Sequence, residues 1–377
     1  MIDIKAFLSA LKENGVGFFA GVPDSNLNDF CKLINEEIDP GEHVIAANEG
    51  NAVAIASGYY FGNGCVPLVY MQNSGLGNAV NPLVSLCDPN VYCVPMVLVI
   101  GWRGDPAISD HAQHKTQGRI TPLMLEDMKI PYMIMDEDNA MECAEWAPKK
   151  AKEIGSPVAL IVKKHVLARK DKVPIKDDSY PLSREEAMNV VLDAMPADTI
   201  YSATTGRASR ELYELRNIRN EDHCHDYLNV GSMGHAASVA LGMALAQRSR
   251  KVVCFDGDAA TLMHMGSLAI EAQQKLGNYM HLVLDNGVHE SVGGQPSVAR
   301  KICFTDIAKA CGFETVDYEV NDEETLTKAV KELSASDKPG FIDVKIHAGL
   351  RPDMPPLRFE HKATIDSLKN ELTGNNL

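Results

Sequence analysis

The sequence lacks the features that mark membrane and secreted proteins. No apolar run reaches the roughly 18 residues that a membrane-spanning helix requires. Residues 1–15 are typical of a short amphipathic helix, without the apolar stretch and cleavage site of a signal peptide. The nine cysteines are scattered and form no CxxC pair. We therefore expect reduced thiols and a cytoplasmic location.

Positive charge is also scarce, and other binding signatures are missing. The formal net charge is −15, which argues against nucleic acid or an anionic membrane as a partner. No GxGxxG motif with a later acidic residue follows a strand, which argues against a dinucleotide-binding oxidoreductase. The sequence His223-Cys224-His225 has no second ligand pair nearby, so we interpret it as a surface loop rather than a metal site.

Short apolar segments rich in β-formers alternate with helix-like segments along the 377 residues. That length predicts about two domains. Short strands that are apolar throughout are typical of parallel sheets covered by helices on both faces, which indicates the α/β class. The predicted strands include Val66–Tyr70, Val94–Ile100, Val158–Val162, Thr199–Ser202, Lys251–Phe255, Met280–Leu284 and Gly340–Ile346.

A polar, proline-containing segment divides the chain, and the two halves resemble each other. We predict domains at 1–168 and 184–350, a linker at 169–183, and a tail at 351–377 with a polar helix near its end. GNAVAIASG at 50–58 resembles GHAASVALG at 234–242, and the same offset places Ser74 opposite Asp258. This pattern predicts two duplicated, doubly wound parallel-sheet domains, although chance similarity between helices rich in alanine and glycine is the alternative.

Polar residues follow two apolar strands of the second half. Asp256-Gly257-Asp258 follows one strand, and Asp285-Asn286-Gly287 follows the next. Because one crossover separates them, both groups can lie at adjacent strand ends, where ligands bind in parallel sheets. A carboxylate, an amide oxygen and a backbone carbonyl suit Mg²⁺ and leave positions for two diphosphate oxygens and water. The following helix can aim its N-terminus at the diphosphate.

This pattern resembles the metal-binding signature of the thiamine diphosphate-dependent 2-oxo acid decarboxylase family. The family has Gly-Asp-Gly followed by Asn, and here Ala259 replaces the second glycine. The resemblance implies that Asp258, Asn286 and the carbonyl of Val288 bind Mg²⁺. It also implies that Gly257 and Ala259 contact the cofactor.

Two further segments extend the resemblance to the rest of the cofactor. In the family, a residue beneath the cofactor forces its two rings into a V shape, and this residue corresponds to Met233 in Gly231-Ser232-Met233-Gly234. The resemblance implies that the carbonyl of Gly231 accepts a hydrogen bond from the pyrimidine amino group. An ordinary core methionine is the alternative. The family's catalytic glutamate corresponds to Glu49, which could instead be a first-turn acid favoured by the helix dipole. Since the family builds each cofactor pocket from two chains, the resemblance implies a homo-oligomer.

The length excludes the family's middle domain and points to its compact branch, which decarboxylates phosphonopyruvate or sulfopyruvate. The segments 21–27, 72–78 and 110–119 carry this closer resemblance, which implies conversion of 3-phosphonopyruvate to phosphonoacetaldehyde and CO₂ in phosphonate biosynthesis. A substrate with a second anionic group needs cations or several donors. The candidates, several of them on a predicted loop at 110–119, are Asp24, Ser25, Asn73, His111, His114, Gln117 and Arg119.

Several alternatives remain open from the sequence. Residues 110–119 could be a solvated loop, Asp24 could cap a helix, and Arg103 and His289 are weaker candidates for the site. Sulfopyruvate is the alternative substrate. A non-catalytic subunit with the thiamine diphosphate fold is the alternative of another class, but it should have lost Glu49, Asp258 or Asn286, and all three are present.

Overall fold

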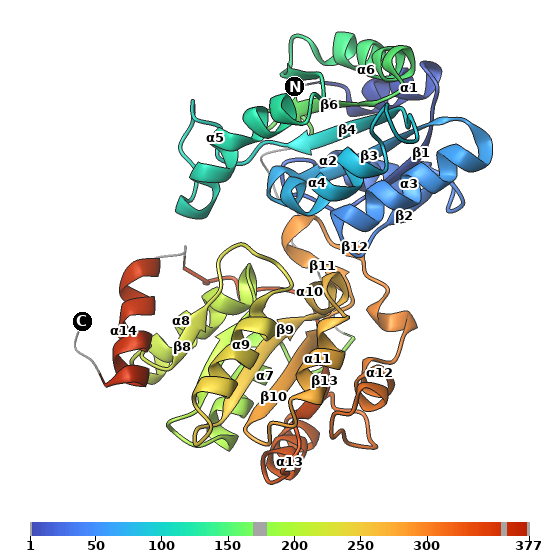
Figure 1. The fold of residues 1–377 in the computed structure, drawn as a ribbon. Helices are drawn as coiled ribbons and strands as arrows, with labels where there is room; N and C mark the ends of the chain where they lie inside the picture. The colour runs from blue at the N-terminus through green and yellow to red at the C-terminus, as the bar shows by residue number, and fades with distance from the viewer. Residues whose placement is uncertain (1, 169–178, 356–359, 375–377) are drawn as a thin grey trace. The chain divides into compact units, whose positions relative to one another are not determined.

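The computed structural model describes residues 2–168, 179–355 and 360–374. The chain forms two compact units, Met1–Val173 with Ser291–Gln295 and Pro174–Glu290 with Pro296–Leu377 (Figure 1). Residues 169–178 of the predicted linker lie outside the described residues. No helix in the described part of the chain is both long and apolar enough to cross a membrane.

The first unit is a six-stranded parallel sheet between two layers of helices. The strand order is β2-β1-β3-β4-β6-β5. One apolar core lies between the sheet and α1, α2 and α6, and another lies between the sheet and α3 to α5. The elements are α1 (Ile4–Glu13), β1 (Val16–Gly21), α2 (Asn28–Glu37), β2 (His43–Ile45), α3 (Glu49–Asn63), β3 (Val66–Gln72), η1 (Asn73–Gly75), α4 (Leu76–Ser85), β4 (Met96–Gly101), α5 (Ala112–Asp127), β5 (Tyr132–Met135), α6 (Ala140–Ile154) and β6 (Pro157–Val162).

The second unit is a five-stranded parallel sheet, again between two helical layers. The strand order is β13-β10-β9-β7-β8. One core involves α7, α8 and α13, and the other involves α9, α11, α12 and α14. The elements are α7 (Arg184–Ala194), β7 (Ile200–Ala203), α8 (Arg207–Arg219), β8 (Asp226–Leu228), α9 (Ala236–Ala246), β9 (Val252–Gly257), α10 (Asp258–Met263), α11 (Ser267–Gln273), β10 (Tyr279–Asp285), β11 (Val288–His289), η3 (Ala299–Lys301), α12 (Phe304–Cys311), α13 (Glu323–Ser334), β13 (Gly340–Lys345) and α14 (His361–Thr373). Two further short elements, η2 (Glu290–Val292) and β12 (Gln295–Pro296), each include residues of both units.

Five strands of the first sheet follow the same order as the five strands of the second, and β5 is an additional edge strand. The order β2-β1-β3-β4-β6 corresponds to β8-β7-β9-β10-β13, so β3 and β9 occupy equivalent positions in the middle of their sheets. The similar glycine- and alanine-rich segments lie in α3 and at the start of α9, whose first residue is Ala236, and Ser74 and Asp258 each lie just past a central strand. The structure therefore confirms the prediction of two doubly wound parallel-sheet domains without a middle domain.

The interpretation of residues 110–119 as a loop is wrong. Helix α5 begins at Ala112 and contains most of this segment. Its buried residues, Gly118, Thr121 and Leu125, are three and four positions apart and form one buried stripe, while Lys115, Thr116 and Arg119 are exposed. Because most residues of this segment are polar, its sequence did not predict a helix, and the helix buries only one narrow face.

Candidate active site

The candidate metal ligands of the second unit lie at paired strand ends. In the parallel pair of β9 and β10, Gly257 is the partner of Leu284. Asp258 and Asn286 therefore follow neighbouring strands at the same edge of the sheet, as the sequence predicted. Asp258 is also the first residue of α10. Carboxylate and amide oxygens placed in this way are suited to a hard divalent cation.

Asp258 is a buried carboxylate without a cationic partner of its own. Ser297 Oγ donates a hydrogen bond to its Oδ2, and no ion pair to Asp258 occurs among the described residues. Burial, with a smaller contribution from the nearby Asp285, raises the pKa of Asp258 to about 7. Burying an ionised carboxylate is costly unless a cation compensates it, so this position favours a bound metal ion.

A buried glutamate orients the second candidate ligand. Asn286 donates from Nδ2 to Oε2 of Glu290 at 3.0 Å, and its Oδ1 accepts from the backbone N–H of the half-buried Val288 at 3.1 Å. Glu290 also binds the guanidinium groups of Arg184 and Arg207. The amide of Asn286 is thereby held in one orientation by a charged cluster.

Removing the charge of Glu290 should destabilise the second unit by about 3 kcal/mol, because Arg184 is buried and loses one of its two anionic partners. Urea unfolding of Glu290→Gln would measure this loss. Glu37→Gln is the matched control. Glu37 pairs with Lys5 at the surface, so its substitution should lower the free energy of unfolding by less than about 1 kcal/mol. Equal losses in the two variants would contradict the role given to the buried cluster.

The segment Gly231–Gly234 forms a turn with three left-handed residues. The φ angles are +79° at Gly231, +44° at Ser232 and +82° at Gly234, a conformation that glycine adopts without strain. The N–H of Gly231 donates to Oγ1 of Thr205 at 2.7 Å. Met233 is only half-buried, whereas Met188 and Met280 lie in the core. This turn presents Met233 and the backbone of Gly231 beside the strand end of β7.

Sequence reasoning missed two threonines at that strand end. Thr204 and Thr205 directly follow β7 and precede α8. Oγ1 of Thr204 is buried and has no hydrogen-bond partner among the described residues, so it can donate a hydrogen bond to an oxygen atom of a ligand. A Thr-Thr-Gly sequence between an apolar strand and a helix was the available signal, since such turns bind phosphate groups. The described residues thus fit a diphosphate and its metal ion.

Glu49 of the first unit lies at the start of α3. Asn48 caps this helix by accepting from the N–H of Asn51 at 3.0 Å. The Glu49 carboxylate is buried, and Nδ2 of Asn78 donates to its Oε2 at 3.2 Å. Gly75 packs against the carboxylate so closely that any Cβ there would overlap it. The side chain is therefore held in a defined position by α3 and the start of α4.

The first candidate substrate residues gather at the carboxyl edge of the first sheet. Asp24 follows β1, is fully buried, and accepts from Nε2 of Gln72 at 2.6 Å and from the N–H of Asn26 at 3.1 Å. Burial raises the pKa of Asp24 to about 6. The alternative that Asp24 caps the next helix is wrong, because α2 begins at Asn28 with Leu27 at the cap position.

Arg103 connects most of the remaining candidates. It forms a bidentate ion pair with Asp110, at 2.7 and 2.9 Å, and Nη1 donates to Oγ of Ser25 at 3.4 Å. Its backbone N–H and carbonyl oxygen both bind the side chain of Asn73. Gln117 joins this group by donating to the carbonyl of Asn73 at 3.1 Å. Arg103, a weaker candidate from the sequence, is therefore the centre of the polar group.

The three remaining candidates lie on or beside α5. His114 is partly buried, and burial together with the charge of Arg103 lowers the pKa of its imidazole to about 4, so it is neutral at pH 7. His111 and Arg119 are exposed. The structure thus brings His114 toward the Arg103 group and leaves His111 and Arg119 facing solvent.

Comparison with known proteins agrees with this arrangement. The family described as "Thiamine pyrophosphate enzyme, N-terminal TPP binding domain" matches residues 4–123, and "Thiamine pyrophosphate enzyme, C-terminal TPP binding domain" matches residues 204–344. The chain belongs to the thiamine pyrophosphate enzyme family, whose cofactor is also called thiamine diphosphate.

Curated relatives narrow the comparison within that family. The chain is 34% identical to the phosphonopyruvate decarboxylase of Streptomyces viridochromogenes over 371 residues, covering 93% of this chain and 89% of the relative. It is 34% identical to the phosphonopyruvate decarboxylase of Streptomyces hygroscopicus, with 93% and 88% covered. It is 27% identical to the sulfopyruvate decarboxylase of Methanosarcina acetivorans, with 96% and 97% covered.

Proposed function

We propose that the chain is a thiamine diphosphate- and Mg²⁺-dependent lyase that decarboxylates 3-phosphonopyruvate to phosphonoacetaldehyde and CO₂, in the cytoplasm and as a step of phosphonate biosynthesis. The observation that carries the proposal is the pair formed by buried Asp258 and Asn286 at adjoining strand ends. The similarity to two phosphonopyruvate decarboxylases over most of the chain supports the reaction and the substrate class.

The second unit would hold the cofactor's diphosphate and metal ion. Asp258 and Asn286 would bind Mg²⁺ through their side chains and Val288 through its carbonyl, while Gly257 and Ala259 let the backbone come close to the diphosphate. The buried hydroxyl of Thr204 would donate to a diphosphate oxygen. Around the rings, the cofactor contacts would come from Gly231, Ser232 and Met233. When bound, thiamine diphosphate supplies the nucleophilic carbon and the electron sink that loss of CO₂ requires.

Glu49 would perform the proton chemistry. Its buried carboxylate would hydrogen-bond a ring nitrogen of the aminopyrimidine and hold a proton there, which activates the cofactor. The carboxylate must be placed accurately, because proton transfer requires hydrogen-bond distance. Asn78 and Gly75 would set that position.

A substitution beside Glu49 tests this positioning. Gly75→Ala should lower turnover roughly 100-fold, because the new methyl group displaces the carboxylate from its position. Gly77→Ala is the matched control, since it lies two residues away with open space around its Cβ and should leave turnover unchanged. Steady-state kinetics of both variants would measure the effect. Equal activity of Gly75→Ala and Gly77→Ala would contradict the placement of Glu49.

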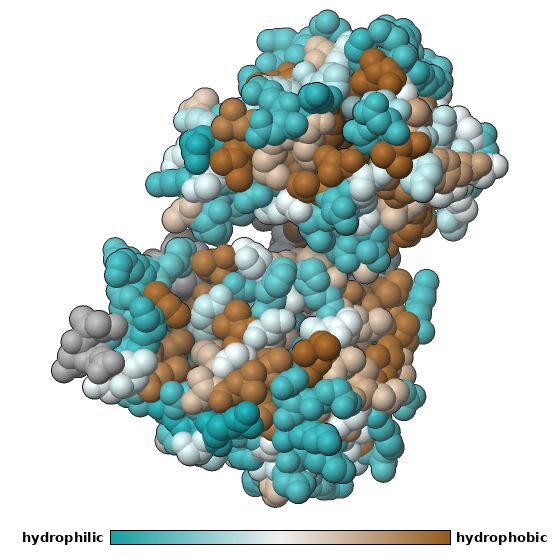
Figure 2. Space-filling model, viewed as in Figure 1, coloured by the Kyte–Doolittle hydropathy of each residue, from teal (hydrophilic) through white to brown (hydrophobic). Residues whose placement is uncertain are grey.

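A second copy of this chain would complete the site. Helices α3 and α4 and the loop after α4 expose large apolar side chains, among them Ile55, Phe61, Val84, Val91 and Tyr92, with Phe61 54% and Tyr92 60% exposed. Apolar surface is visible over this part of the first unit in Figure 2. Because Glu49 begins α3, an interface on this helix would join the glutamate of one chain to the diphosphate site of another, giving a symmetric homo-oligomer.

The polar group at the carboxyl edge of the first sheet would bind the substrate's remote anion. Arg103 supplies a guanidinium group, and Ser25 and Asn73 supply neutral donors, with Gln117 and His114 nearby. A phosphonate needs several such contacts, whereas the reacting carboxylate should be held weakly because its charge disappears during the reaction. Asp24, with its raised pKa, would donate or accept a proton beside this group.

Sulfopyruvate is the second candidate substrate, since a sulfopyruvate decarboxylase aligns over 97% of its own length. A non-catalytic role is disfavoured because Glu49, Asp258 and Asn286 are all retained. The test is kcat/KM for phosphonopyruvate, sulfopyruvate and pyruvate, measured in parallel with saturating thiamine diphosphate and Mg²⁺. We expect phosphonopyruvate to be preferred and pyruvate to be poorest. A preference for sulfopyruvate would change the assigned substrate to sulfopyruvate. A preference for pyruvate would contradict a site for a remote anion.

A further inference from the structure

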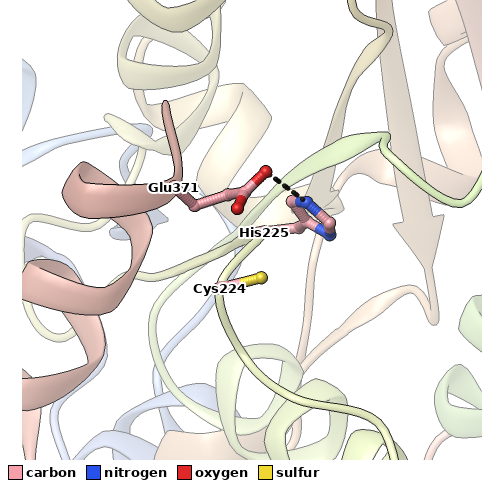
Figure 3. Close-up of side chains that lie close together, drawn as sticks. All are labelled: Cys224, His225 and Glu371. Carbon is pink, nitrogen blue, oxygen red and sulfur yellow. Dashed lines mark hydrogen bonds and ion pairs between the residues drawn. The ribbon is translucent and has the colours of Figure 1, made fainter. Parts of the chain in front are cut away.

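Three potential metal ligands converge at the edge of the second sheet, away from the strand ends that carry Asp258 and Asn286. Cys224 and His225 immediately precede β8, and Glu371 lies near the end of α14 (Figure 3). The thiol sulfur, an imidazole nitrogen and a carboxylate oxygen all lie within 4.8 Å of one another. The sequence interpretation of this segment as a plain surface loop could not include Glu371, which is 146 residues from His225.

The protein holds these three side chains in place. Leu368 of α14 is 2% exposed and packs in the core against the sheet, which fixes the helix beside β8. Nε2 of Gln247 donates to the carbonyl of Leu372 at 2.9 Å. Oε1 of Glu371 is 3.3 Å from Nε2 of His225 and 3.2 Å from Nη1 of Arg250. Since both contacts use Oε1, ligation through Oε2 is compatible with the ion pair to Arg250.

Three carboxylates lie near the thiol. Cys224 is partly buried, and its N–H donates to Oδ1 of Asp222 at 3.0 Å, whereas Glu371 and Asp226 are paired with Arg250 and Arg216. The carboxylate of Asp222 therefore adds negative charge beside the sulfur, which favours a cation there.

We propose that Cys224, His225 and Glu371 bind a divalent metal ion of intermediate softness, such as Zn²⁺, which fastens α14 to the edge strand β8. A thiolate, an imidazole and a carboxylate form a donor set that suits Zn²⁺ and not Mg²⁺, and water would complete the coordination. The sulfur–metal bond forms as the thiol proton leaves to solvent. The site is separate from the proposed active site and does not depend on the proposed function.

Cobalt provides a direct test, because a thiolate bound to Co²⁺ absorbs in the near ultraviolet. The metal-free full-length protein would be titrated with Co²⁺ in excess Mg²⁺, so that oxygen-ligand sites remain filled. We expect the thiolate band to rise to one equivalent, to disappear when Zn²⁺ is added, and to be absent in Cys224→Ser. Cys303→Ser, which changes an exposed cysteine outside the site, is the control that should keep the band. No band in the unmodified protein, or a band that survives Cys224→Ser, would overturn the site.

Limited proteolysis tests the fastening of the helix. Zn²⁺ should slow cleavage within α14 at least several-fold in the unmodified protein and have no effect in Cys224→Ser or Glu371→Gln. Equal cleavage rates with and without Zn²⁺, in a protein that shows the cobalt band, would overturn the structural role. Neither experiment measures decarboxylation, so its failure is distinguishable from failure of the proposed function.

Discussion

Glu49→Gln should lower kcat roughly 10²–10⁴-fold while thiamine diphosphate still binds, because the change removes the carboxylate that moves the proton and leaves the second unit intact. Glutamine keeps the size of the side chain and its contact with Asn78, so the fold should be preserved. The measurements are single-turnover CO₂ release and cofactor binding by the same preparation.

An exposed glutamate of the same unit is the control for this prediction. Glu36→Gln in α2 carries the same change of charge at the surface and should leave kcat unaltered. If Glu49→Gln turned over substrate as fast as Glu36→Gln, another group would have to activate the cofactor, and the assignment of Glu49 would be wrong.

Asp258→Asn should abolish the Mg²⁺-dependent part of thiamine diphosphate binding. The substitution removes the only charged protein ligand proposed for the metal ion. Loss of that ligand should raise the Kd of the cofactor by roughly 100-fold or more. Substitution of residues that only hydrogen-bond to a metal ligand already lowers metal affinity by about 10–100-fold. Titration of the cofactor at fixed Mg²⁺ would measure the change. Asp306→Asn, an exposed first-turn aspartate of α12, is the control.

The same residue predicts how metal binding depends on pH. Because burial raises the pKa of Asp258 to about 7, the metal-free folded protein binds a proton more tightly than the unfolded chain does. This group therefore lowers the stability of the metal-free protein as the pH rises through about 4 to 7. Mg²⁺ requires the carboxylate, so its affinity should fall as the pH drops below about 7. Titration of Mg²⁺ into the unmodified protein with thiamine diphosphate, at pH values below and above 7, would measure this change. A Mg²⁺ affinity that does not depend on pH in this range would contradict the metal-ligand role.

The sequence predicted the features that follow from local patterns. Asp258 and Asn286 could be placed together because parallel strands end at one edge and a single crossover separates β9 from β10. The seven named strands overlap observed strands, since uninterrupted apolar segments mark strands that are buried on both faces. Two edge strands were not predicted. Most residues of β5 are only partly buried, and β8 has only three residues, so neither forms an apolar segment that stands out in the sequence.

Contacts made by the fold explain what the sequence could not predict. The central place of Arg103 depends on Asp110, Ser25 and Asn73, which approach it only when three strands end together. The role of Thr204 became visible through a buried hydroxyl without a partner, which no sequence pattern reports. Glu371 and Cys224 likewise meet only because α14 returns to β8.

The most direct test of the proposed function is CO₂ release from phosphonopyruvate by the purified full-length protein, first without cofactors and then after adding thiamine diphosphate and Mg²⁺. We predict no release without them, and release with equimolar phosphonoacetaldehyde when both are present. Release that is independent of thiamine diphosphate, or none from any 2-oxo acid with both cofactors present, would contradict the proposed mechanism.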